Sequence, residues 1–173
     1  MLAVLGIVAA SWGLGGTLAI LGWAVYRLGL IGLETFSHTL SWYHWVVLVV
    51  WVLFMAHSEG YKGFQRGFSP RVAARIAYLK QHPTLLRTLL APLFCMGFFG
   101  IQRRRQIVTF CLTLGIIGLV QLVSMLTQPW RGIVDIGVVV GLAWGIVSLA
   151  IFTAQAFTDA SFNHSPQMPD SAS

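Results

Sequence analysis

Long apolar stretches, separated by shorter polar segments, make up most of the chain. Four of them predict transmembrane helices, at residues 2–26, 42–57, 106–127 and 133–157. A helix needs about 20 apolar residues to cross the ~30 Å hydrocarbon core of a bilayer. The second stretch is shorter than this, but it begins with the aromatic cluster at 42–45, and Trp and Tyr prefer the membrane–water interface. The pattern therefore predicts an all-α, multi-pass membrane bundle with four spanning helices.

A fifth apolar stretch, residues 88–101, has two interpretations. As a helix it is only about 21 Å long, and it contains Pro92. If this stretch crossed the membrane, Arg103, Arg104 and Arg105 would lie on the side opposite to the basic segment that precedes it. If it enters and returns, all these cations share one side, which the positive-inside rule favours. We therefore expect a re-entrant or tilted segment, with a fifth span as the alternative.

The polar parts of the chain predict three further features. Residues 57–87 are basic and are expected to form a cytoplasmic loop. Within this loop, Ser69 and Pro70 are typical of a helix start, and the pattern that follows predicts a short amphipathic helix in the interface plane. Residues 158–173 are polar and predict a disordered tail. The chain is thus expected to be one membrane domain, residues 1–157, followed by this tail.

Composition and charge support a membrane protein. The chain is 57% hydrophobic and only 9% charged, whereas soluble domains are about 25% charged. The net charge of +6 does not indicate nucleic acid, because nine of the 11 basic residues lie between positions 62 and 105, beside apolar stretches. Such clusters indicate the cytoplasmic side and contact with anionic lipid. Six basic residues are expected to contact lipid headgroups: Arg71, Arg75, Lys80, Arg103, Arg104 and Arg105.

Two faces of small residues predict close helix packing, because the absence of bulky side chains lets backbones approach. The first predicted span carries one of them. The last span carries the other, a glycine stripe at Gly137, Gly141 and Gly145 that Ser148 completes. The preceding span has Thr113 and Gln121 near multiples of a helical turn. We expect these two stripes to face each other within the chain, with a homo-oligomer interface as the alternative.

Asp135 is the only acid inside the apolar run of a predicted span. An intramembrane carboxylate is a candidate for proton or cation handling. However, Arg131 lies four residues earlier, and the helix N-terminus also favours an acid near this position. The structural interpretation, a local ion pair, is therefore preferred.

A second group of candidate functional residues lies where the second span meets the basic segment: His57, Glu59, Tyr61, Lys62 and Arg66. A His and an acid suit acid–base chemistry or metal binding. Yet positions i and i+2 of a regular helix point about 200° apart, so these two residues cannot chelate one ion. The structural alternative is an ion pair between Glu59 and Lys62. No metal or cofactor is expected.

Three function classes remain open. The preferred one is a non-catalytic accessory, assembly or lipid-contacting subunit that acts through residues 57–87, where glycine, aromatic and cationic residues are dense. Its expected partners are anionic lipids and a membrane protein or a second copy. The alternatives are a small transporter or channel component, and an intramembrane lipid-modifying enzyme that uses His57 and Glu59. Both termini are expected in the cytoplasm, and the membrane is expected to be the plasma (inner) membrane of a bacterium.

Overall fold

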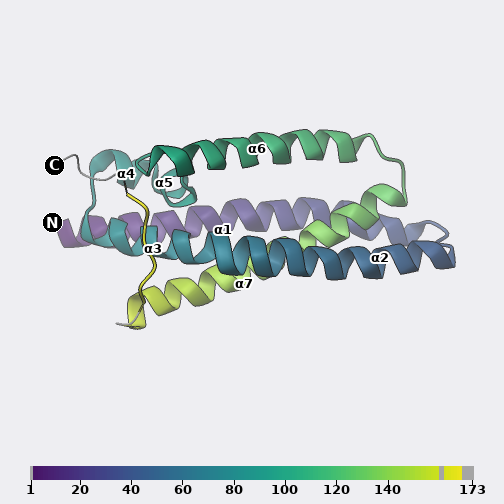
Figure 1. The fold of residues 1–173 in the computed structure, drawn as a ribbon, viewed down its shortest axis with the longest axis horizontal. Coiled ribbons are helices and arrows are strands. Elements are labelled where there is room, and N and C mark those ends of the chain that lie inside the picture. The colour runs from purple at the N-terminus through teal and green to yellow at the C-terminus, as the bar shows by residue number, and fades with distance from the viewer. Residues whose placement is uncertain (1, 160–161, 169–173) are drawn as a thin grey trace.

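The computed structural model describes residues 2–159 and 162–168. Within these residues all regular structure is helical, as predicted. Figure 1 shows that the long helices run roughly along one axis. The elements are α1 (Leu2–Glu34), the 3-10 turn η1 (Thr35–Ser37), α2 (Trp42–Met55), the π-helix η2 (Ala56–Phe68), α3 (Ser69–Gln81), α4 (Leu85–Leu89), α5 (Ala91–Met96), α6 (Arg103–Ser124) and α7 (Trp130–Thr158).

The two ends of the molecule differ in content. One end, which we call the basic end, holds the start of α1, the end of α3, the short helices α4 and α5, the start of α6 and the end of α7 (Figure 1). The other end, the hairpin end, holds η1 and the connections from α1 to α2 and from α6 to α7. At this hairpin end the side-chain amide of Gln128 donates to the carbonyl of Ile31 at 3.3 Å. The chain therefore runs the length of the molecule four times.

Among the described residues, three helical stretches are long and apolar enough to cross a membrane: Val4–Ser37, Arg103–Ser124 and Trp130–Thr158. The expected span at 42–57 is not among them. Its apolar part is α2, which has 14 residues and continues directly into the polar η2. The first helix is also longer than the predicted 2–26, because it continues through Arg27 as far as Glu34.

The segment predicted as a loop at 57–87 is helical as far as Gln81. Ala56 and Ser69, at the two junctions of η2, both have α-helical backbone angles, so α2, η2 and α3 form one uninterrupted helix (Figure 1). In η2 the amide hydrogen bonds reach five residues back, as Ser69 N to the Phe64 carbonyl does. Glycines suit this wider turn, since a Cβ at Gly67 would approach the Lys62 carbonyl to 3.3 Å.

Helix α3 belongs to the core and does not lie on the surface in an interface plane as predicted. It packs against α1, α5 and α7, and Val72, Ile76 and Leu79 are fully buried. Ala73 and Ala74 are buried as well, although the amphipathic pattern did not place them on the apolar face. Because their side chains are small, neighbouring helices can also approach α3 on this side. Helices α1, α5 and α7 therefore bury more of α3 than one apolar face.

The ambiguous stretch at 88–101 forms α4 and α5 followed by turns. The helical path breaks at Leu90, and Gly97 ends α5 with φ 93° in the left-handed region, where glycine is favoured. Helix α5 packs on the small face of α1, where a Cβ at Gly13 would lie 2.8 Å from the Cys95 sulfur. This part of the predicted small face of α1 therefore does receive a neighbour. Both short helices stay at the basic end, from which α6 also departs (Figure 1).

Part of the predicted disordered tail is packed on the protein. The backbone amide of Gln102 donates to the carbonyl of Gln167 at 3.0 Å, and Met168 contacts the core. Residues 162–168 thus cover the basic end, and the rest of the tail beyond them lies outside the described residues.

Candidate functional site

The glycine stripe of α7 packs against α2 and η2. Added Cβ atoms at Gly141 and Gly145 would lie 2.8 Å from the Glu59 Cβ and 2.5 Å from the Phe64 ring, and the hydroxyl oxygens of Ser148 and Ser69 lie 2.6 Å apart in a hydrogen bond. The first glycine of the stripe, Gly137, faces Trp51 and Met55 in the same way. In the structure this stripe therefore packs against other helices of the same chain.

The predicted partner of the stripe was wrong. Thr113 and Gln121 lie on α6, which has no buried residue, and the Thr113 hydroxyl donates to the Thr109 carbonyl of its own helix at 2.9 Å. The glycines instead face Trp51 and Met55 of α2 and Glu59 and Phe64 of η2, since the missing Cβ atoms let these neighbours approach the α7 backbone closely.

The surface of η2 that α7 leaves uncovered carries polar side chains, and Glu59 and Gln65 lie at its border with α7. We call these residues the η2 polar face: His57, Glu59, Tyr61, Lys62, Gln65 and Arg66. Four of them, His57, Glu59, Lys62 and Arg66, are exposed, and the other two are half-buried. All of the predicted candidates near the second span therefore lie together on one helical segment, and Gln65 was missed because an isolated glutamine carries no recognisable spacing.

Two local contacts order the η2 polar face. The His57 and Tyr61 rings stack with centroids 5.8 Å apart, and the Arg66 guanidinium lies 5.3 Å from the centre of the same Tyr61 ring. On the α7 side, the indole N–H of Trp144 donates to the Gln65 side-chain oxygen at 2.8 Å. These contacts hold an aromatic ring between a histidine and a cation, and they tie the face to α7.

The side chains of the η2 polar face can bind a partner through ionic contacts and hydrogen bonds. Within the part of the chain that the structure describes, no three His, Cys, Asp or Glu residues are grouped to hold a metal ion. The expected ion pair of Glu59 with Lys62 does not form, since Arg131–Asp135 is the ion pair found among the described residues. Glu59 and Lys62 are both exposed, so their charges are available to a neighbouring surface.

Asp135 occupies the predicted local ion pair. Its Oδ2 lies 3.9 Å from the Arg131 Nε, and Asp135 is 4% exposed. The distance is long, and neither atom has a hydrogen-bond partner among the described residues. Asp135 is on the same helix as the glycine stripe but lies toward the hairpin end, away from the η2 polar face.

Arg75 is not a headgroup contact as predicted, because it is buried with 4% exposure. Its Nη1 donates to the Cys95 carbonyl at 2.9 Å and its Nε to the Pro166 carbonyl at 3.2 Å. Burial, followed by the charge of Arg71, lowers the pKa of Arg75 to about 10, so the guanidinium stays charged at neutral pH. Arg75 therefore joins α3 to the end of α5 and to the tail.

The other predicted headgroup residues remain accessible. Lys80, Arg103, Arg104 and Arg105 are exposed, and Arg71 is half-buried. Burial, and secondarily the charge of Arg105, lowers the pKa of Arg71. These cations give the basic end a positive surface.

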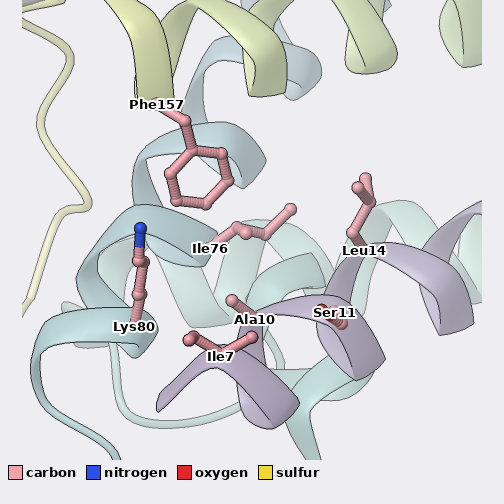
Figure 2. A pocket seen from close by; sticks show the side chains of 7 residues that line it. All are labelled: Ile7, Ala10, Ser11, Leu14, Ile76, Lys80 and Phe157. Carbon is pink, nitrogen blue, oxygen red and sulfur yellow. The ribbon is translucent and has the colours of Figure 1, made fainter. Parts of the chain in front are cut away.

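One feature that the sequence did not indicate is a pocket between α1, α3 and α7 at the basic end (Figure 2). It has a volume of about 320 Å³ and is lined by Ile7, Ala10, Ser11, Leu14, Ile76, Lys80 and Phe157. Its lining residues come from α1, α3 and α7, and no pattern in the sequence relates these three helices to one another.

Comparison with family models, curated proteins and solved structures found no match. The class of protein therefore follows from the fold alone. The part of the chain that the structure describes is all-helical and has three helices long and apolar enough to cross a bilayer, which indicates a membrane protein.

Proposed function

We propose that the protein crosses the membrane four times, with the basic end in the cytoplasm, and that it serves as an accessory or assembly subunit. Helices α1, α6 and α7 meet the length and composition of a span. The helix formed by α2 and η2 packs along α7, so a membrane that α7 crosses also surrounds α2 and η2. Helices α4 and α5 then form the re-entrant segment. The proposed location is the plasma membrane of a bacterium, with the basic end on the cytoplasmic side that the positive-inside rule favours.

The depth of the η2 polar face supports the subunit role. Trp130 and the Tyr43 ring, whose centroids are 6.4 Å apart, belong to an aromatic cluster suited to the interface at the hairpin end. From Trp130 to Gly141, α7 rises about 16 Å, roughly half of a ~30 Å hydrocarbon core. Gly141 contacts Glu59. Glu59 therefore lies near the middle of the membrane in this arrangement.

An exposed charge at this depth is costly. On insertion scales a charged side chain at the membrane centre costs about 2.5–3.5 kcal/mol. Lys62 and Arg66 have long side chains that reach toward the headgroups, but the short side chain of Glu59 does not. A protein surface that supplies polar groups would remove this cost. The exposed η2 polar face at membrane depth is the observation that carries the proposal, and its partner is a transmembrane segment with polar side chains.

Site-specific photo-crosslinking tests this proposal. A photoreactive amino acid is placed at Lys62, and the control carries it at Leu119, an exposed position of α6. After irradiation of intact membranes, we expect a discrete protein adduct from position 62, because a partner helix covers it, and only lipid adducts from position 119. Adding Glu59→Gln and Arg66→Gln to the position-62 probe should abolish the adduct.

The proposal fails if position 62 gives the same lipid adducts as position 119, or if the adduct persists unchanged without the two charges. An adduct to a second copy of this chain would identify a homo-oligomer as the assembly.

A transporter or channel component is the second candidate function. Both signs of charge are exposed on η2 at the proposed membrane depth, and such a surface also suits the wall of a water-filled path between subunits. Ion flux into proteoliposomes that Lys62→Gln reduces would favour this role over the accessory one.

A further inference from the structure

The pocket at the basic end has a polar and an apolar part. Figure 2 shows Lys80 at one side of the pocket and Leu14 at the other, with Ile7, Ala10 and Ser11 of α1 between them. The floor is formed by Ala10 and Ile76, which are 6% and 0% exposed. The one cation that lines the pocket is therefore placed at the end of an apolar groove.

The groove runs along α1. Its four α1 residues follow the spacing i, i+3, i+4 and i+7, which is one face of a helix. From Ile7 to Leu14 this face is about 10 Å long. The close approach of Gly6 to the Lys80 carbonyl fixes the level of Lys80 at the Ile7 end. Moving from Lys80 toward Leu14 therefore means moving from the basic end toward the middle of the molecule.

The groove opens to the surroundings of the bundle. Ile7 is 55% and Phe157 45% exposed, and they belong to α1 and α7, two of the helices that meet the criteria of a span. The Lys80 Nζ lies 4.8 Å from the centre of the Phe157 ring, so the ammonium is held beside the groove. Its volume of about 320 Å³ is within the usual range for a small-molecule site.

We infer that this groove binds one anionic phospholipid, with the phosphate at Lys80 and an acyl chain along α1 toward Leu14. The order of groups in the groove, a cation at the basic end and then apolar surface, is the order of groups in a phospholipid whose headgroup faces the cytoplasm. The positive surface formed by Arg71, Arg103, Arg104 and Arg105 adds charge complementarity at the same end. A soluble anion would use Lys80 but would leave the apolar groove empty.

Equilibrium binding to the purified full chain in dodecyl maltoside tests this inference. The ligands are dioctanoyl phosphatidylglycerol, dioctanoyl phosphatidylcholine and glycerol 3-phosphate, and native mass spectrometry counts the lipids retained. We expect one phosphatidylglycerol bound per chain in preference to phosphatidylcholine, and no binding of glycerol phosphate at the same concentration. Lys80→Gln should weaken binding about tenfold by removing a charge-assisted contact.

Two matched pairs of variants locate the site. Ser11→Phe fills the groove from an exposed position and should prevent binding, whereas Val8→Phe adds the same ring on α1 outside the groove and should not. Arg104→Gln removes a cation of the basic end that does not line the groove and should have much less effect than Lys80→Gln. Thermal unfolding of each variant verifies that it is folded.

Three results would overturn the inference: equal binding of the two phospholipids, equal effects within either pair of variants, or competition by glycerol phosphate alone, which would assign the site to a soluble anion. Because the assay uses the isolated chain, these results are independent of the crosslinking outcome at the η2 polar face.

Discussion

At the scale of single residues, Arg75 shows how a buried cation is accommodated without a carboxylate among its hydrogen-bond partners. Within the described residues its two hydrogen-bond partners are backbone carbonyls, those of Cys95 and Pro166. Carbonyls at the end of a helix carry partial negative charge, which favours a cation there. The sequence could not separate Arg75 from Arg71, because both lie on a basic, amphipathic pattern, and only the packing of α5 and the tail decides which one is covered.

We predict that Arg75→Ala lowers the free energy of unfolding by about 2–3 kcal/mol, because hydrogen bonds to a charged group are lost and buried carbonyls are left unpaired. The control is Arg104→Ala, an exposed position of the basic end, where the change should stay within about 0.5 kcal/mol. Unfolding in mixed micelles, followed by circular dichroism, gives both values. Equal effects of the two substitutions would show that the guanidinium contacts of Arg75 do not stabilise the fold.

At the scale of elements, the helices were largely predictable and their neighbours were not. Apolar runs place α6 and α7 within about three residues of their predicted ends, because the bilayer thickness and helical rise determine span length. The glycine stripe was also visible in the sequence. Its partner was not, because a stripe of small residues shows only that some helix approaches closely. The continuity of α2, η2 and α3 was missed for a related reason: glycines that usually weaken a helix here allow the wide turns of η2.

Some glycines lie against a neighbouring helix and others face open space. Substitution by leucine should affect stability differently at these two kinds of position. Gly141→Leu should destabilise the protein by about 1–3 kcal/mol or more, since the new side chain meets η2 in a packed interface. Gly118→Leu on α6 meets open space and should be neutral or stabilising by up to about 1 kcal/mol, because leucine favours a helix more than glycine does. Parallel unfolding measurements on the two variants check this. A neutral Gly141→Leu would mean that α7 does not rely on close contact with η2.

At the scale of the whole molecule, the four passes of the chain give the two ends different surroundings. The start of α1 and the end of α7 lie at the basic end (Figure 1), which also holds the pocket and the buried Arg75. The hairpin end holds the first residues of α2 and α7, the aromatic Trp42 and Trp130. The sequence anticipated this polarity because the charge pattern along the chain is strong. It did not reveal the pocket, whose walls come from three helices that are distant in sequence.

Cysteine labelling of sealed cells tests the proposed orientation. In a Cys111→Ser background, Thr127→Cys at the hairpin end should react with a membrane-impermeant maleimide from outside. Arg104→Cys at the basic end should react only after permeabilisation. Both positions are exposed, so accessibility within the protein does not differ between them. Labelling of Arg104→Cys from outside would overturn the proposed orientation.

The isolation of α6 has a consequence for the evolution of the chain. None of its side chains is buried, so replacing one hydrophobic residue of α6 by another changes few packing contacts within the protein. The α7 positions that touch η2 tolerate no such exchange, since each is matched to a particular neighbour. Among orthologues, the sequence of α6 should therefore vary rapidly while its length and hydrophobic character are kept. The glycine stripe on α7 should be nearly invariant.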